Sequence, residues 1–297
     1  MRCESTVKVV LFCGGSGMRI REYSEAVPKP LVDIGRRPIL WHLMKYYAHY
    51  RHRDFVLCLG YKGDVVKEYF LSREPMGVGK MKRWTDREAV TKFHSEIEDW
   101  NITFVETGLD ACVGQRLAAV QPYLHEGEPF LANYADGLTS LHLPDMLTDF
   151  QQYSPVGQFL SVRPENYSFH AADTNADGRV TKFQRIDQAD IWMNGGFFIF
   201  DYRIFDYILK DEDFVDEPFM RLIEEGQLRT LRFAGFWACM DTFKERVLLE
   251  DLIADGPAPW EIWAMPGRRE QDPIAAAHGD PEETPKERAG LSRSEGH

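Results

Sequence analysis

An apolar run that ends in glycines, VKVVLFC from Val7 to Cys13, constrains the fold more than any other segment. Nearly continuous hydrophobicity is typical of a strand buried on both faces of a parallel sheet. Three further strand-like runs follow, at residues 54–60, 101–107 and 129–137. Helical patterns lie between them, starting at Pro38, Asp64 and Gln115. The alternation predicts βαβ units, and therefore an α/β protein with a Rossmann-like, doubly wound sheet.

The pattern changes after about residue 155. The segment Asn175-Ala176-Asp177-Gly178 is typical of a turn between two short strands, which predicts a small antiparallel β insertion over the sheet edge. A buried strand at 194–201 then returns to a mixed sheet, and helices are expected to end at Gly226 and to begin at Thr242. Residues 265–297 are rich in proline, glycine and charge, so we expect one domain over 1–264 and a disordered tail after it.

Composition excludes several classes of function. The 297 residues carry 35 basic and 47 acidic side chains, a net charge of -12 that disfavours nucleic acid and anionic membranes as partners. The absence of a long apolar run or a signal peptide predicts a cytoplasmic location. The five cysteines are scattered without a CxxC pair, so we interpret them as reduced core residues. Any phosphate site must therefore be a local concentration of positive groups.

A glycine-rich turn follows the first strand and spans Gly14 to Arg19. It lacks the Lys-Ser or Lys-Thr of a P-loop and the third glycine of a dinucleotide fingerprint. Its backbone N–H groups could approach a phosphate, or it could be a plain turn between strand and helix. Ten residues later, Pro28 and Pro30 hold Lys29 in a stiff stretch, which would lower the entropy lost when a lysine binds phosphate. The alternative is a solvated surface lysine.

Together the two segments, FCGGSGMR and PKP, resemble the GGxGTR…KP signature of the sugar-1-phosphate nucleotidyltransferases. The resemblance continues in order through PILWHLMKYY, GYKGDVVKEYF, WNITFVETG, YADG, MNGGFFIFD, GFWACMDT and APWEIW, and it is strongest to the cytidylyltransferase members. It covers about residues 7–263. It implies a glycosyltransferase-A-like nucleotidyltransferase fold and a reaction between a nucleoside triphosphate and a sugar 1-phosphate.

The resemblance also implies roles for individual residues. Arg19 and Lys29 take the catalytic positions on the triphosphate, while Asp136 and Asp241 take the positions that hold Mg²⁺; an aspartate before a helix, such as Asp241, could instead be a helix cap. The nucleotide-binding positions are Phe12, Cys13, Gly14, Gly15, Ser16, Gly17, Met18, Arg19, Lys29, Arg116 and Ala135. The sugar-binding positions are Asn194, Gly195 and Arg185.

Three positions depart from the family pattern. Met18 replaces a threonine, and Ala135 replaces the glycine of YGDG. The EKP segment, whose lysine binds the sugar phosphate in the family, reads Gln184-Arg185-Ile186-Asp187 here. Arg185 or Lys182 could substitute for that lysine, but an arginine differs from a lysine in reach and hydration.

The resemblance therefore implies a homo-oligomeric enzyme that transfers a cytidylyl group from CTP to α-D-glucose 1-phosphate, giving CDP-glucose and pyrophosphate. Two alternatives stay open at this stage. One is a transferase that uses another nucleoside triphosphate or another sugar 1-phosphate, because the contacts that separate bases are largely made by backbone. The other is a catalytically weak module that binds nucleotide sugars. Retention of Arg19, Lys29, Asp136 and Asp241 together favours an active enzyme.

Overall fold

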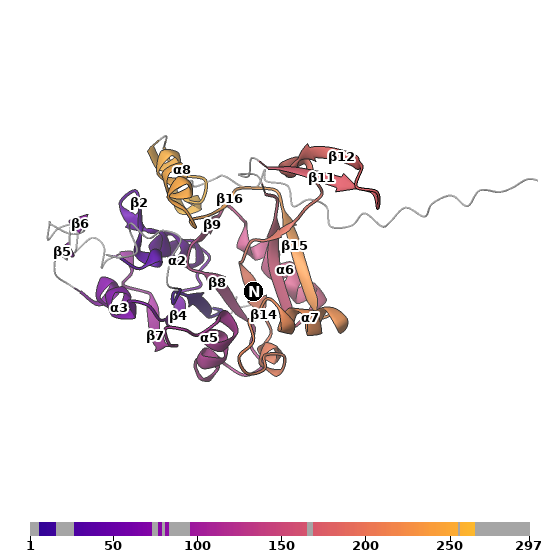
Figure 1. Ribbon diagram of the computed structural model, residues 1–297. Helices are drawn as coiled ribbons and strands as arrows, with labels where there is room; N and C mark the ends of the chain where they lie inside the picture. The colour runs from indigo at the N-terminus through magenta and orange to yellow at the C-terminus, as the bar shows by residue number, and fades with distance from the viewer. Residues whose placement is uncertain are drawn as a thin grey trace, which may run out of the picture.

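The computed structural model describes residues 6–15, 27–72, 77–78, 81–82, 96–164, 169–254 and 256–264. Its centre is a mixed sheet whose described strands are β1 (Val9–Phe12), β4 (Asp54–Leu59), β7 (Asn101–Glu106), β8 (Phe130–Tyr134), β10 (Gly157–Val162), β13 (Met193–Asn194), β14 (Phe198–Phe200) and β15 (Leu228–Phe233) (Figure 1). Strands β1, β4, β7 and β8 run parallel, with β1 between β4 and β8. Their carboxyl ends therefore meet at one edge of the sheet.

The second half of the sheet continues from β8. Strand β14 runs antiparallel to β8, and β10 runs antiparallel to both β14 and β13. Strand β15 pairs with β10 in parallel. Two reversals restore the original direction, so β10 and β15 end at the same edge as β1 and β8. This carboxyl edge is where open α/β sheets place their ligands.

Helices cover both faces of the sheet and enclose two cores. One core packs against α2 (Ile39–His49), α3 (Gly63–Leu71), α6 (Leu143–Tyr153) and α8 (Phe243–Ala254). The other packs against α5 (Val113–Val120) and α7 (Glu217–Glu224). All four residues of β1 are buried, as a strand flanked by helices on both sides requires. Short 3-10 helices lie at Lys29–Leu31, Gln121–Tyr123, Ile186–Gln188, Tyr202–Asp206 and Ile262–Ala264.

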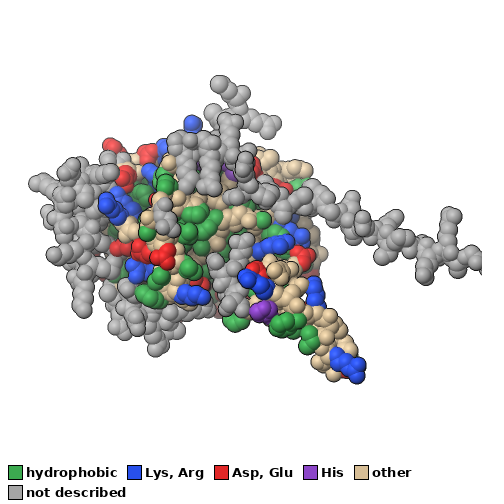
Figure 2. Space-filling model, turned by 90° about the horizontal axis from the view of Figure 1, so that it is seen from above, with side chains coloured by type: hydrophobic (Ala, Val, Ile, Leu, Met, Phe, Trp, Pro, Cys, Tyr) green, Lys and Arg blue, Asp and Glu red, His purple; other side chains and the backbone are tan. Residues whose placement is uncertain are grey.

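Short antiparallel strand pairs lie outside the central sheet. Strands β11 (His170–Thr174) and β12 (Val180–Arg185) form a hairpin that projects from the body of the molecule (Figure 1, Figure 2). Its turn is held by Asn175, whose side-chain oxygen accepts from the backbone N–H groups of Asp177 and Arg179 at 3.1 and 2.9 Å. The remaining pairs are β2 (Asp33–Ile34) with β3 (Arg37–Pro38), β5 (Gly77–Val78) with β6 (Met81–Lys82), and β9 (Gly137–Thr139) with β16 (Trp237–Cys239).

The predicted fold class is confirmed: the sheet is mixed, doubly wound and carries a small antiparallel hairpin. The helix that was expected to end at Gly226 is α7. Helix α6 was not predicted. The proposed tail at 265–297 lies outside the described residues. Within the described part of the chain, no helix is long and apolar enough to cross a membrane.

His42 is buried where α2 meets the last described segment. Trp260 Nε1 donates to His42 Nδ1 at 3.3 Å, so Nε2 carries the proton and donates to the carbonyl of Ile34 at 3.0 Å. The ring is therefore neutral and satisfied at both nitrogens. Burial, together with a smaller effect of the nearby Arg37 charge, lowers the pKa of His42 to about 4, although hydrogen bonds to backbone oppose the shift.

This burial predicts an acid-dependent loss of stability. As the pH falls, an unfolded histidine takes up its proton near pH ~6.5, whereas folded His42 resists protonation down to about pH 4. Stability that is present above about pH 6.5 is thus lost progressively below it, by about 2 kcal/mol between about pH 7 and about pH 5. Urea denaturation of the wild type and of His42→Gln at both pH values measures this. The variant should lack this part of the pH dependence, and equal slopes in the two proteins would contradict the assignment.

Candidate functional site

The turn after β1 is shaped by a buried arginine from α5. Arg116 is 4% exposed, and its guanidinium lies where the carboxyl ends of β1, β4 and β7 come together. Nη2 donates to the carbonyl of Gly14 at 3.0 Å, and Nη1 donates to Thr107 Oγ1 at 2.7 Å. The other acceptors are the carbonyls of Leu59, Gly108 and Leu109. Arg116 therefore joins the ends of three strands instead of pointing into solvent.

This arrangement explains why the turn needs glycine. A Cβ on Gly14 would lie 1.9 Å from Arg116 Nη1, and a Cβ on Gly60 would lie 2.8 Å from the same atom. Gly15, by contrast, is exposed, and no atom of the described residues lies within 4 Å of its Cβ position. Gly14 thus makes room for the arginine, while Gly15 leaves its backbone open to a ligand.

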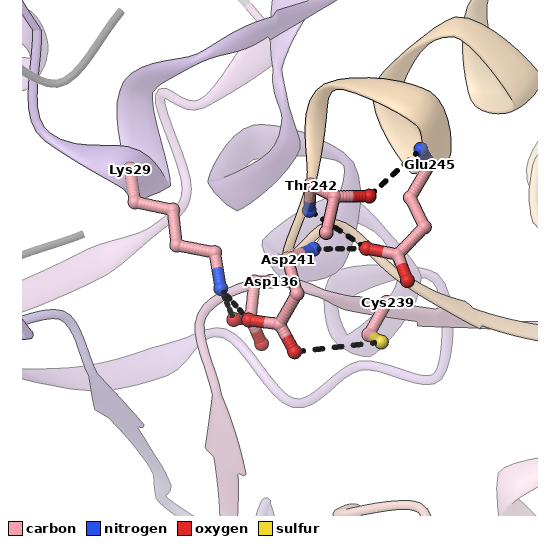
Figure 3. A network of polar contacts seen from close by, with 6 residues as sticks. All are labelled: Lys29, Asp136, Cys239, Asp241, Thr242 and Glu245. Carbon is pink, nitrogen blue, oxygen red and sulfur yellow. Dashed lines mark hydrogen bonds and ion pairs between the residues drawn. The ribbon is translucent and has the colours of Figure 1, made fainter. Parts of the chain in front are cut away.

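Lys29 lies between two carboxylates at the same edge of the sheet (Figure 3). Its Nζ donates to Asp136 Oδ2 and, at 2.6 Å, to Asp241 Oδ1. The lysine side chain is 15% exposed and the two aspartate side chains are 23% and 37% exposed. The cluster is therefore half-buried and accessible from one side.

Separate elements bring these three residues together. Pro28 and Pro30 flank Lys29 at the start of a 3-10 helix. Strand β8 ends at Tyr134, whose register partner is Phe12 of β1, so Asp136 and Gly14 both follow two residues later on adjacent strands. Strand β9 then pairs with β16, and the N–H of Met240 donates to the carbonyl of Asp136 at 3.0 Å. The last contact places Asp241 beside Asp136.

The start of α8 is capped by residues other than Asp241. Glu245 Oε2 accepts from the backbone N–H groups of Asp241 and Thr242, both at 2.7 Å, and Thr242 Oγ1 accepts from the N–H of Glu245 at 3.3 Å (Figure 3). This is a capping box. Thr242 and Glu245 cap the helix, so the cap does not use the side chain of Asp241, which contacts Lys29.

The charges in the cluster are strongly coupled. Burial acts to lower the pKa of Lys29, but the carboxylates of Asp136 and Asp241 outweigh it, and the pKa is raised above its ordinary value. Lys29 therefore stays protonated at neutral pH. Its ammonium compensates two negative charges that would otherwise face each other.

The donor set is compatible with a magnesium ion. Mg²⁺ prefers oxygen ligands and commonly takes one or two carboxylates, with water and substrate phosphates completing its octahedron. Asp136 and Asp241 offer two such carboxylates close enough to share one ammonium. No larger group of metal-ligating side chains occurs in the part of the chain that the structure describes. A divalent cation would therefore depend on substrate oxygens and on displacement of Lys29.

The Asn194-Gly195 pair lies two strands from β1 at the same edge. Asn194 is exposed, and its side-chain oxygen accepts from the N–H of Gly196 at 2.9 Å. Gly195 is held from both sides: its N–H donates to Leu160 at 2.8 Å, and its carbonyl accepts from Trp237 Nε1 at 2.7 Å. The backbone here is rigid, which suits a site that positions a ligand.

The candidate arginine on the hairpin has a partner of its own. Arg185 Nε and Nη2 donate to the two carboxylate oxygens of Asp187 at 3.1 and 2.6 Å. These hydrogen bonds, which Arg185 donates and Asp187 accepts, raise the pKa of Arg185 and lower the pKa of Asp187. Lys182 is exposed on the same strand. Binding of a phosphate by Arg185 would compete with this ion pair.

The remaining predicted positions divide into two groups. Phe12, Cys13 and Ala135 have buried side chains, so only their backbone is available to a ligand. Ser16, Gly17, Met18 and Arg19 lie outside the described residues.

Sequence reasoning missed two residues that support the site. Trp237 is one: its indole N–H donates to the carbonyl of Gly195, a role that no sequence pattern indicates. Glu245 was not singled out, although the Thr-x-x-Glu spacing at the start of a helix is a recognisable capping signal.

Comparison with known proteins assigns the class. The family described as nucleotidyl transferase matches residues 8–243, which include Lys29, Asp136 and Asp241. The chain therefore belongs to the nucleotidyl transferase family.

Individual relatives narrow the comparison. The chain is 36% identical over 259 residues to the glucose-1-phosphate cytidylyltransferase of Salmonella typhimurium, a match that covers 86% of this chain and all of that protein. It is 35% identical over 261 residues to the probable glucose-1-phosphate cytidylyltransferase of Bacillus subtilis, with the same coverage. Among solved structures, UDP-glucose pyrophosphorylase in complex with UDP-glucose superposes with a TM-score of 0.63 at 14% identity, covering 84% of this chain and 98% of that one. The last likeness concerns the fold alone.

The packing of Arg116 against the turn yields a stability prediction. Gly14→Ala forces a methyl group into the guanidinium, so we expect a loss of about 1–3 kcal/mol in the free energy of unfolding. Gly15→Ala is the matched control: its methyl group meets no atom of the described part of the chain within 4 Å, so stability should change by less than about 0.5 kcal/mol. Urea denaturation measures both. Equal stability of the two variants would show that Arg116 does not pack against Gly14 in this way.

Proposed function

We propose that this chain transfers a cytidylyl group from CTP to α-D-glucose 1-phosphate and releases CDP-glucose and pyrophosphate, as a step in nucleotide-sugar synthesis. The observation that carries the proposal is the Lys29, Asp136 and Asp241 cluster beside the Gly14 turn, in a chain 36% identical to a glucose-1-phosphate cytidylyltransferase over that protein's whole length.

The chemistry requires positioning and charge neutralisation. A phosphate oxygen of the sugar 1-phosphate attacks the α-phosphorus of CTP, a new O–P bond forms, and the bond to the bridging oxygen of the β-phosphate breaks. Pyrophosphate leaves in line with the attack. Several negative charges meet in this step, so catalysis depends on holding the reactants and on compensating their charge.

Residue roles follow from this requirement. Asp136 and Asp241 would hold Mg²⁺, which when bound polarises phosphate oxygens and offsets their charge. Lys29, once it leaves the carboxylates, would bind the triphosphate together with Arg19. The remaining nucleotide-binding assignments are Phe12, Cys13, Gly14, Gly15, Ser16, Gly17, Met18, Arg116 and Ala135, and those for the sugar are Asn194, Gly195 and Arg185. The homo-oligomeric state and the cytoplasmic location also stay predictions of the sequence.

Pyrophosphate release tests the reaction. Purified protein with Mg²⁺ and glucose 1-phosphate should release pyrophosphate with CTP in preference to ATP, GTP, UTP or dTTP. Preference for another nucleoside triphosphate would change the substrate assignment. If none of the five nucleoside triphosphates gave pyrophosphate, the result would favour a nucleotide-sugar-binding module or another sugar phosphate.

The assignment of Asp136 as a metal ligand is tested by a variant in the same pyrophosphate assay. Asp136→Asn keeps the shape of the side chain and removes its charge, so turnover should fall by about a hundredfold or more while the fold is retained. Asp99→Asn is the control, since Asp99 is exposed and pairs with Arg53 at 2.5 Å beside the opposite ends of the strands. Equal turnover of the two variants would remove Asp136 from the site.

The position of Lys29 predicts competition with a metal ion. Lys29→Met removes the ammonium that both carboxylates contact, so Mn²⁺ should bind the nucleotide-free variant about tenfold more tightly than the wild type, or better. Electron paramagnetic resonance of free Mn²⁺ measures this without turnover. Lys67→Met, which removes an exposed ion pair with Glu106, should leave Mn²⁺ binding unchanged. Weaker binding by Lys29→Met would show that Lys29 does not compete for these carboxylates.

A further inference from the structure

Two arginines share one tryptophan ring near Asn194. The Cζ atom of Arg163 lies 5.1 Å from the ring centroid of Trp192, and that of Arg232 lies 5.2 Å from it. Trp192 Nε1 donates to Asp190 at 3.0 Å, which fixes the orientation of the ring. A tryptophan face attracts guanidinium groups. The ring therefore keeps two cationic side chains close together, and both are exposed.

Strand register places this cluster beside the proposed sugar site. Ser161 of β10 is paired with Asn194 on one side and with Arg232 of β15 on the other. Val162 is paired with Met193, so Arg163 comes opposite Trp192 one position further on. Because side chains alternate along a strand, Arg163, Trp192 and Arg232 project from the same face of the sheet as Asn194. All lie at the carboxyl edge.

The cluster concentrates positive charge without compensation. Over the described stretches of the chain, neither guanidinium has an ion pair with a carboxylate, whereas Arg185, Arg203 and Arg221 each have one. The nearby carboxylate of Asp190 is bonded to the indole. In a molecule with a net charge of -12, two like charges fixed near each other are an attractive site for an anion.

An anion site is needed here, because the proposed acceptor carries a phosphate group that must be bound near Asn194. The hairpin arginine, Arg185, already binds Asp187 through two hydrogen bonds. Guanidinium groups match phosphate oxygens well, since each presents a planar fork of N–H donors.

We propose that Arg163 and Arg232, supported by Trp192, bind the phosphate group of the sugar 1-phosphate. The proposal rests on the proposed function, and it names the residues that recognise the acceptor. Under this proposal Arg163 and Arg232 bind the acceptor and do not bind the nucleotide.

Steady-state kinetics of two variants tests it. Arg163→Gln and Arg232→Gln should each raise the KM for glucose 1-phosphate by about tenfold or more, because each removes charge-assisted hydrogen bonds to one phosphate. The KM for CTP should stay unchanged, a split that a general structural defect would not produce. An unchanged KM for glucose 1-phosphate in both variants would overturn the proposal, as would a rise confined to the KM for CTP.

The same strand offers a matched control. Arg229 of β15 also lies against an aromatic ring, with its Cζ atom 3.4 Å from the ring centroid of Tyr153, but it pairs with Asp149 at 3.8 Å near the other end of the strand. Arg229→Gln should leave both KM values unchanged. Arg185→Gln completes the set: if it alone raised the KM for glucose 1-phosphate, the hairpin arginine would be the phosphate ligand and the proposal would be wrong.

A binding measurement separates this proposal from the reaction itself. Calorimetric titration of the wild type with glucose 1-phosphate should give a signal that glucose does not give and that Arg163→Gln and Arg232→Gln weaken about tenfold. If the wild type released no pyrophosphate yet showed this pattern, the transferase reaction would fail and the phosphate site would stand. Binding that is equal in wild type and both variants would overturn the site whatever the turnover assay showed.

Discussion

The contact of one ammonium with two carboxylates organises the carboxyl edge of this protein. Lys29 reaches Asp136 and Asp241 across sequence separations of 107 and 212 residues, so the contact exists only when β1, β8, the β9–β16 pair and the start of α8 are all in place. The two aspartates come together because β9, which directly follows β8 and Asp136, pairs with β16, which directly precedes Asp241. The ion cluster therefore forms only in the folded protein. Because it is only half-buried, a small cation can reach the carboxylates and a phosphate can reach the lysine.

Basic side chains at this edge have either a structural role or a role in attracting an anion, depending on their partners. Arg116 is buried and donates to four backbone carbonyls and a hydroxyl, so its charge is used to hold strand ends together. Arg163 and Arg232 lie against an aromatic ring, which supports a guanidinium without neutralising it. An acidic protein that handles phosphate esters needs the second arrangement, since a neutralised arginine adds little attraction for an anion.

Much of the fold could be predicted, because the apolar runs and the glycine and proline positions are local signals. The strand starting near Val7, the helix after Pro38 and the turn at Asn175 follow from such signals. Helix α6 was not predicted, because its local signal is weaker: it has a proline in its first turn and few buried residues. The role of Arg116 could not be derived, because its partners are backbone carbonyls that no side-chain pattern reveals. The grouping of Arg163, Trp192 and Arg232 also depends on the pairing of three strands far apart in the sequence.

The two kinds of cation imply an order of events at the edge. Lys29 is paired with the carboxylates that would hold a metal ion under the proposed function, so its ammonium serves as their counter-ion in the free protein and would be displaced by such an ion. That charge then lies beside the turn after β1, where a triphosphate would bring negative charge of its own. Arg163 and Arg232, held by Trp192 across β10 and β15, need no such exchange and attract an anion from the start. Under the proposed roles the nucleotide site would need a metal ion and the triphosphate to be complete, whereas the side chains of the proposed acceptor site are already grouped by strand pairing in the folded sheet.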